Sequence, residues 1–520
     1  MLLRTAVLKK LTKLMEAEMR VTPCKLVPAL VAVFAAAAAG AQTEFADIQS
    51  RVTEFTLKNG MKFIVLERHK APVASFLTYA DVGGAQETKG ITGLAHMFEH
   101  IAFKGTHVIG TKDYTKEKAA LEQVEKAYYA RRDEKRKLKP DPEKLKKLEQ
   151  AFKDAQEEAG KFIAKEEFGE AIERAGGRGL NATTAEDRTN YYFSLPSNSI
   201  ELWFYLESER FLHPVFREFY KERDVVMEER RLSESQPIGK LIEEFQAIAY
   251  KAHPYGEPVI GHMSDLENLT RADAEAFFKK YYAPSNLIGV VVGDVNPKRV
   301  RELAEIYFGR IPSGPKPEPL RTVEPPQEAE RRVTLTLQSQ RVVLIGYHKP
   351  DVNHPDDAVY DAIGSLLSEG RSSRLYRGLV RDKKVATQVG GFPGFPGQKY
   401  PGLFLFFGFT APGHKNEEVE KAIDEEVERL KTGLAAKEEL DGVKRRVRAG
   451  LIRQLADNST LAGHLSTAQA LTGDWRNLFK LIDKINAVTP QDVQRVAKET
   501  FTRNNRTIGM IEPAESAQAK

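Results

Sequence analysis

Along the chain, the spacing of hydrophobic and polar residues alternates between the pattern typical of strands and the pattern typical of helices. Apolar runs rich in β-branched and aromatic residues predict strands, and apolar positions three and four residues apart predict helices. Each half of the chain carries both patterns, which predicts an α+β protein of two domains. The expected strands are residues 61–67, 72–83, 331–338, 341–348 and 402–411, and the expected helices include 90–103 and 354–368.

One pattern occurs twice, at a separation of 219 residues. Residues 269–286 and 488–505 each predict an amphipathic helix with a threonine in the capping position, followed by an apolar strand. A chance match between two helix patterns is the alternative, but two related halves are the simpler interpretation. The positions that align without a gap are Thr270 and Thr489, Asp273 and Asp492, Lys279 and Lys498, Tyr282 and Phe501, and Asn286 and Asn505.

Two segments interrupt this alternation of strands and helices. Residues 312–326 contain six prolines, which favour an extended connection and indicate a boundary between domains. Residues 113–165 are strongly charged, with apolar positions at helical spacing on both sides of a Lys-Pro-Asp-Pro turn at 139–142. We expect a helical hairpin inserted in the first domain, which is either a solvated spacer or an element that docks a partner or covers a site.

The N-terminal segment has the layout of a secretory signal, with basic residues, an apolar run over 26–39 and small residues at 39–41. The apolar run contains Pro28 and is shorter than the roughly 20 residues that a membrane-spanning helix needs. We therefore expect cleavage before Gln42 and a periplasmic or secreted protein. The alternatives are a membrane anchor and an intracellular protein without a leader, and Met19 is an alternative start.

The length and the charge of the chain exclude some classes of protein. A chain of 520 residues is too long for one ordinary core. Of its formal charge of +5, residues 1–41 carry +4, so the remainder lacks the basic excess that non-specific nucleic-acid binding requires. The one cysteine, Cys24, lies in the expected leader, which leaves the mature chain without a disulfide or a thiol nucleophile.

The strongest chemical signal is the sequence HMFEH at residues 96–100. Residues four apart on a helix lie on one face, so His96 and His100 can aim two imidazoles at one divalent ion, with Glu99 within reach of a water there. A single histidine on a helix is usually a surface or core residue, but the paired spacing favours a metal site. Zinc then needs a third protein ligand and an open fourth position.

Carboxylates for that third position occur in ERDVVMEE, residues 222–229. Glu222 and Glu229 share a helix face but lie about 10 Å apart along the axis, so only one of them can bind the same ion. Glu228 points about 100° away from Glu229. Taken without HMFEH, these carboxylates would indicate only a solvated helix face.

HMFEH followed by ERDVVMEE resembles the inverted zinc signature of the pitrilysin and mitochondrial-processing-peptidase family, the inverzincins. The resemblance covers nearly the whole mature chain. It implies two related α/β-roll domains. The other blocks that match, in the family's order, are VGGAQETKGITGLAHMFEHIAFKGT, GLNATTAEDRTNYYFSLP, HPYGEPVIG and YYAPSNLIGVVVGDV.

This resemblance also implies roles for individual residues. His96, His100 and Glu229 become the ligands of one zinc ion per chain, Glu99 the general base, and Glu222 a supporting carboxylate. Asn181 and Ala182 match the place where family members hold a substrate backbone as an added strand; without the resemblance, Asn181 would be a turn residue. The implied activity is that of a zinc endopeptidase acting on peptides or unfolded polypeptide segments.

Two features depart from the family pattern. The insertion at 113–165 lengthens the interval between His100 and Glu229. In the second domain, Val380 and Thr387 stand where family members that complete the active site carry Arg and Tyr. We therefore expect the catalytic subunit of a heterodimer whose other subunit supplies Arg and Tyr, in preference to a homodimer; a non-catalytic scaffold or chamber subunit is the alternative.

The organisation we expect along the chain is a signal peptide, two related domains and a linker. The segments are a signal peptide over 1–41, a zinc-binding peptidase domain over 42–311 with the hairpin at 113–165, a linker over 312–330, a related domain over 331–513 and a tail over 514–520.

Overall fold

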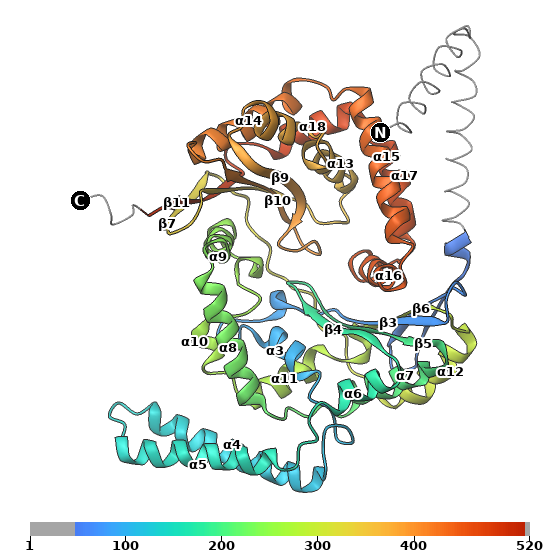
Figure 1. Ribbon diagram of the computed structural model, residues 1–520, viewed down its shortest axis with the longest axis vertical. Helices are drawn as coiled ribbons and strands as arrows, with labels where there is room; N and C mark the ends of the chain where they lie inside the picture. The colour runs from blue at the N-terminus through green and yellow to red at the C-terminus, as the bar shows by residue number, and fades with distance from the viewer. Residues whose placement is uncertain (1–46, 515–520) are drawn as a thin grey trace, which may run out of the picture. The chain divides into compact units, whose positions relative to one another are not determined.

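A computed structural model describes residues 47–514 (Figure 1). The expected signal peptide, with its cleavage site, lies outside the described residues, as does the expected tail beyond residue 514. Within the described part, no helix combines the length and the apolar character needed to cross a membrane.

The first half of the described chain builds one mixed sheet in the order β1-β2-β6-β3-β5-β4. Strand β6 pairs parallel with β2 and antiparallel with β3, and β4 forms one edge. Its elements are β1 (Val52–Thr56), β2 (Lys62–Glu67), β3 (Val73–Ala80), α3 (Leu94–Ile101), α4 (Tyr114–Lys135), α5 (Pro142–Gly160), α6 (Glu167–Arg174), β4 (Arg178–Thr184), β5 (Thr189–Pro196), α7 (Ile200–Leu212), α8 (Phe219–Ser235), α9 (Pro237–Ala249), α10 (Met263–Leu266), α11 (Arg271–Tyr281), β6 (Leu287–Gly293) and α12 (Pro297–Tyr307).

The second half repeats this plan in a sheet of order β7-β11-β8-β10-β9. Strand β11 pairs parallel with β7 and antiparallel with β8, as β6 does with β2 and β3. Its elements are β7 (Arg331–Leu337), β8 (Val342–Lys349), α13 (Asp357–Ser368), a π-helix (Tyr376–Asp382), β9 (Ala386–Phe395), β10 (Gly402–Thr410), α14 (Asn416–Thr432), α15 (Lys437–Gln454), α16 (Asn458–Thr472), α17 (Asn477–Ala487), α18 (Pro490–Thr500) and β11 (Arg506–Pro513).

The repeat expected from the sequence is confirmed in atomic detail. Thr270 caps α11 and Thr489 caps α18, each in a capping box with the aspartate three residues later. The side-chain amides of Asn286 and Asn505 then make equivalent bonds. Each donates to the carbonyl five residues earlier, at 2.9 Å, and to a carbonyl at the end of the neighbouring antiparallel strand, Asp81 or His348. The two α/β halves are therefore related down to their turn chemistry.

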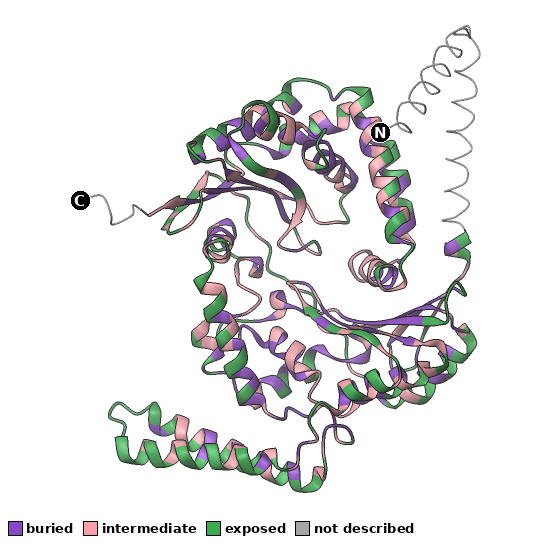
Figure 2. Cartoon of the chain, in the orientation of Figure 1, coloured by how far each residue is buried: buried purple, intermediate pink, exposed green. Residues whose placement is uncertain are grey.

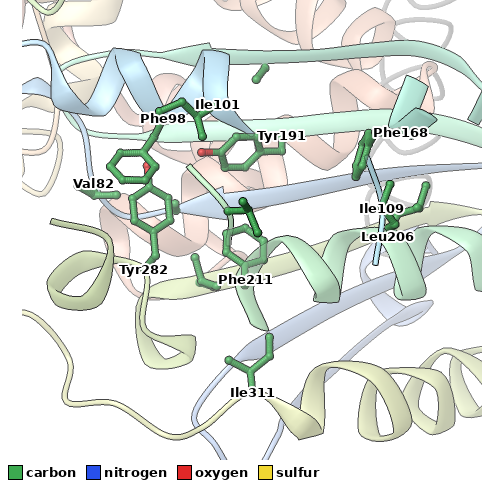
Figure 3. Packing of buried hydrophobic residues seen from close by; sticks show 14 of the residues in the cluster. Val82, Phe98, Ile101, Ile109, Phe168, Tyr191, Leu206, Phe211, Tyr282 and Ile311 are labelled. Carbon is green, nitrogen blue, oxygen red and sulfur yellow. The ribbon is translucent and has the colours of Figure 1, made fainter. Parts of the chain in front are cut away.

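The helix that carries HMFEH is shorter than the pattern predicts. Helix α3 covers Leu94–Ile101, whereas the sequence suggested 90–103. Gly90 and Gly93 have positive φ angles of 100° and 89°, which a right-handed helix does not allow, so the helix cannot begin before Leu94. The inner face of α3 lies in the core of the first half, where Phe98 and Ile101 lie beside Tyr191 and Tyr282 (Figure 3).

The predicted hairpin is also confirmed, as the antiparallel helices α4 and α5 (cyan in Figure 1). Its outer part is exposed (Figure 2), as a solvated spacer would be. Its inner part is not free-standing, because Leu121, Val124, Tyr128 and Phe152 belong to the hydrophobic core of the first half. Residues 312–330, the expected linker, contain neither helix nor strand.

Candidate metal centre

The start of α3 is held by residues outside the helix. Its N-cap is Gly93, which offers no side chain, and a Cβ there would lie 2.7 Å from the Ile260 carbonyl oxygen. The carboxyl group of Glu87 replaces the missing cap, accepting from the backbone N–H groups of Gly93 at 2.7 Å and Ala95 at 2.6 Å. Burial raises the pKa of Glu87 to about 8. The position of the helix is thus fixed from its first turn.

His96 and His100 lie one turn apart on α3, with ring centroids 4.9 Å apart and ring planes at 88°. Both side chains are largely buried, with 16% and 19% of their surface exposed. Burial and the neighbouring His100 lower the pKa of His96 to about 4. At neutral pH His96 is therefore an uncharged imidazole, which is the form that binds metals.

Glu229 reaches the two histidines from α8. Its Oε2 atom lies 3.7 Å from Nε2 of His96 and 3.5 Å from Nε2 of His100. These distances are too long for hydrogen bonds. They fit the separation of roughly 3.4 Å between ligand atoms that each lie about 2.1 Å from a tetrahedral zinc ion. His96, His100 and Glu229 form the one group of potential metal ligands found among residues 47–514.

The donor set also suits zinc chemically, because two imidazoles and a carboxylate make up one of the usual catalytic zinc sites. The side chain of Glu229 is 41% exposed, so the cluster opens to solvent on that side. A catalytic zinc site needs such an open side for its fourth ligand. The described residues therefore fit the ion that the sequence pattern implies.

Glu222 lies behind His100 and does not join the three ligand atoms. Its Oε2 is 3.8 Å from Nδ1 of His100, and its Oε1 is 2.6 Å from Nζ of Lys104. Burial acts to raise the pKa of Glu222, but interactions with His100 and Lys104 outweigh burial and lower it. The Glu222 carboxylate in turn raises the pKa of His100. Glu222 is thus placed to orient the His100 ring.

Glu228 and Glu99 occupy contrasting places. The carboxylate of Glu228 pairs with Arg231 at 2.9 Å on the exposed face of α8, away from the histidines.

Glu99 lies on α3 next to His100 and is half-buried. It makes no hydrogen bond or ion pair with any other described residue.

Asn181 and Ala182 lie on β4, the edge strand of the first sheet, and β4 contacts α3. The Ala182 side chain is buried and that of Asn181 is exposed. The Ala182 N–H donates to the Asn181 side-chain oxygen at 2.9 Å. An open strand edge therefore runs beside the helix that carries the histidines.

Val380 and Thr387 lie in the second half, on the π-helix and at the start of β9. Val380 packs against the second hydrophobic core, and the Thr387 hydroxyl donates to the Phe409 carbonyl at 3.3 Å. Arg381, one position away, forms an ion pair with its neighbour Asp382 at 2.6 Å. Neither expected position carries a guanidinium or a phenol.

Three contributors to the site were missed in the sequence. Lys104 lies three residues beyond the end of α3, where helical spacing no longer applies. Glu87 and Asp265 act through irregular backbone, since Asp265 accepts from the Gly90 and Thr92 N–H groups ahead of α3. No periodic pattern marks such contacts.

Comparisons with known proteins find relatives over most of the chain. The model of insulinase (peptidase family M16) matches residues 62–159 and 157–262, and that of the peptidase M16 inactive domain matches residues 268–447. The chain is 30% identical over 467 residues to the zinc protease PqqE of Helicobacter pylori, which covers 88% of this chain and 92% of the relative. It is 22% identical over 468 residues to the uncharacterized zinc protease YmxG of Bacillus subtilis, covering 89% and 98%.

Solved structures show the same architecture. The crystal structure of a protease from Helicobacter pylori matches with a TM-score of 0.74 and 29% identity, over 89% of this chain and 99% of that one. A peptidase M16 inactive domain from Pseudomonas fluorescens shares the fold, with a TM-score of 0.70 at 17% identity over 90% and 98% of the two chains. The resemblance identified from HMFEH and ERDVVMEE is confirmed: this chain belongs to peptidase family M16.

Proposed function

We propose that this protein is a zinc-dependent endopeptidase that hydrolyses peptides or unfolded polypeptide segments. The observation that carries the proposal is the convergence of His96, His100 and Glu229 from two helices, with ligand atoms at zinc-site spacing and an exposed side. The name zinc protease given to its relatives supports the choice of metal. One ion per chain is expected.

In this proposal each residue of the site has a separate role. His96, His100 and Glu229 would hold the zinc ion, which when bound would supply a Lewis acid for a peptide carbonyl and for the attacking water. Glu99 accepts the proton of the attacking water and donates it to the leaving amine. Glu222, itself neutralised by Lys104, holds the His100 ring in its binding orientation.

The edge strand β4 supports peptides as the proposed substrate class. An extended peptide can add to an open sheet edge through main-chain hydrogen bonds, which a folded protein cannot offer. The Ala182 N–H is the natural donor to such a peptide, and the Asn181 side chain that now accepts from it would have to turn away. Peptides and unfolded segments are therefore the expected substrates.

The test compares wild-type protein from its native source with the Glu99→Gln variant on a library of quenched peptides. Glu99→Gln removes the base but none of the ligands, so we expect zinc content to stay at one per chain and turnover to fall by about 10³-fold or more. Intact cleavage by this variant would exclude Glu99 as the base. Wild-type protein without zinc would exclude the metal site.

A heterodimer is the second part of the proposal, because Val380 and Thr387 replace the Arg and Tyr that complete the site in the family. We expect the isolated chain to bind zinc but to hydrolyse peptides poorly, and a second subunit that supplies Arg and Tyr to restore the rate. Full activity of the isolated chain would contradict this. A zinc-free chain that still assembles with a partner would instead favour the scaffold role.

Export is a further part of the proposal, resting on the signal-like sequence of residues 1–41. N-terminal sequencing of the native protein is the test. A start at or near Gln42 would agree with a periplasmic or secreted enzyme. A start at Met1 or Met19 would favour an intracellular peptidase instead.

A further inference from the structure

Helix α8, which carries Glu222 and Glu229, has different neighbours on its two sides. Glu222 and Glu229 face α3 and its histidines. Tyr220 and Arg223 lie about 180° and 120° around the helix from Glu229 and face the inserted hairpin. Helix α8 is therefore held between the histidine helix on one side and the hairpin on the other.

The hairpin contacts α8 through a layered aromatic cluster. The Tyr128 ring on α4 stacks on the Tyr220 ring with centroids 4.0 Å apart and planes at 22°. Phe152 from α5 meets Tyr220 edge-on at 5.5 Å. The guanidinium of Arg223 lies 5.4 Å from the Tyr128 ring centre and 5.1 Å from that of Tyr220. Such contacts fix the rotation of a helix, because aromatic pairs and cation–π pairs depend on orientation.

Hydrogen bonds reinforce this cluster. Arg223 donates to the Tyr128 hydroxyl at 3.1 Å and to the Leu269 carbonyl at 3.0 Å. The Tyr220 hydroxyl donates to Glu125 on α4 at 3.0 Å. The bonds to α4 join side chains 95 positions apart in the sequence, so the insertion is tied to α8 at several points.

A second attachment lies just ahead of α8. Arg217 is fully buried and pairs with Glu117 on α4 through two hydrogen bonds of 2.6 and 3.1 Å. Its remaining N–H groups donate to the carbonyls of Lys104, Thr106 and Ile109, in the loop that follows α3. A buried guanidinium needs a countercharge, and the hairpin supplies it. One side chain thus joins the end of the histidine helix, the entry to α8 and the hairpin.

We propose that the α4–α5 hairpin is a brace for α8, which keeps Glu229 and Glu222 at binding distance from His96 and His100. This inference rests on the proposed metal site. Tyr128, Arg223 and Arg217 are positioning residues in it, since none of them is among the ligands. The inner part of the insertion does this work, and its exposed outer part is not required for it.

Zinc affinity and backbone hydrogen exchange test the brace. Tyr128→Ala removes the ring that stacks on α8, and we expect zinc binding, measured by competition with a chelator, to weaken about tenfold or more. Amide exchange should accelerate over residues 219–235 and stay unchanged over 94–101. Tyr128→Phe keeps the stack and should bind zinc within about twofold of wild type.

Two controls separate the brace from general destabilisation. Leu138→Ala changes a side chain that is 99% exposed at the outer end of the hairpin, and should leave both readouts unchanged. Phe501→Ala opens a cavity in the second core and should lower Tm without weakening zinc binding.

Each outcome decides between the two proposals. Wild-type zinc affinity and wild-type exchange over 219–235 in Tyr128→Ala would overturn the brace. Equal loss of zinc affinity in Phe501→Ala would also overturn it, since the effect would then be general. A wild-type chain that binds no zinc would refute the proposed function, while exchange over 219–235 would still decide whether the hairpin holds α8.

Discussion

The two halves of the molecule place a helix after the same strand, yet among residues 47–514 only one of these two helices carries potential metal ligands. Helix α3 comes after β3 and turns His96, Glu99 and His100 away from the core. Helix α13 comes after β8, and most of its own residues are buried, among them alanines, an isoleucine and leucines. The common frame therefore does not create the site. The site depends on the residues that one short helix carries and on the second helix set opposite it.

The halves differ again in the segment that joins each of these helices to the next strand. Between α3 and β4 the first half inserts α4, α5 and α6, whereas between α13 and β9 the second half has the π-helix at Tyr376–Asp382. The half that carries the three potential ligands is thus the half that carries the hairpin. This agreement is expected if the hairpin supports α8.

The largest effect should come from removing a ligand on α3, compared with replacing an ionisable residue on the equivalent helix α13. His100→Ala should weaken zinc binding more than about 100-fold, because even residues behind metal ligands often contribute 10–100-fold. Asp361→Asn, on the equivalent helix α13, should leave zinc binding unchanged. Zinc per chain, measured after dialysis against a weak chelator, is the readout.

Asp361 is a demanding control, because burial raises its pKa to about 7 and makes it the most chemically distinctive group on α13. Loss of zinc from Asp361→Asn would mean that the second half contributes to the same site. Retention of zinc by His100→Ala would remove His100 from the ligand set.

The next effect concerns the repeated asparagines. Asn286→Ala and Asn505→Ala each remove two hydrogen bonds to backbone carbonyls, so each should lower the free energy of unfolding by about 1–3 kcal/mol. Chemical denaturation of the two variants measures this. A large cost at one position and none at the other would show that the repeated hydrogen bonds are not equivalent in energy.

The parts of this molecule that sequence could predict are those with local causes. The capping boxes at Thr270 and Thr489 need only four consecutive residues, and the pair His96 and His100 needs only helical spacing. The contact of Arg217 with Glu117 joins positions 100 residues apart and has no periodic signal. The role of the hairpin could therefore not be predicted, although its two helices could.

The chain also shows why boundaries are harder to predict than elements. The apolar pattern around HMFEH continues beyond the helix, but the positive φ angles of Gly90 and Gly93 set its true start. At Gly93 the close approach of Ile260, a residue far along the chain, leaves no room for a side chain. Glu87 then replaces the cap that Gly93 lacks, through a contact that composition does not indicate.

A smaller effect is expected in the pH dependence of the free energy of unfolding, which should differ between variants at the start of α3 and variants at the start of α13. The folded pKa of Glu87 is about 8, above its ordinary 4.5, so the folded state holds a proton more tightly than the unfolded state. The stability that protonated Glu87 adds to the folded state is fully present below pH 4.5 and is lost as the pH rises through 8. Relative to Glu87→Gln, the wild type should lose about 1 kcal/mol or more between about pH 5 and about pH 8.5.

Asp356 lies just ahead of α13, and its contribution to stability should depend on pH in the opposite direction. Its pair with Arg495 lowers its pKa below 3.8, so its contribution is present above that pH and is lost as the pH falls. Asp356→Asn should therefore change stability by a constant amount between about pH 5 and about pH 8.5. Denaturation curves at several pH values distinguish the two, and parallel pH profiles for Glu87→Gln and wild type would contradict the assignment for Glu87.

The smallest effect should come from the two threonine caps. Thr270→Ala and Thr489→Ala each remove one side of a capping box, at a typical cost of about 1 kcal/mol. Helix α18 begins with Pro490, whose fixed φ favours a helix start, whereas α11 begins with Arg271. Thr270 is also buried, while the Thr489 hydrogen bonds are exposed to water. Thr270→Ala should therefore lower the denaturation midpoint more than Thr489→Ala does, and the reverse order would show that burial and the proline do not set the strength of these caps.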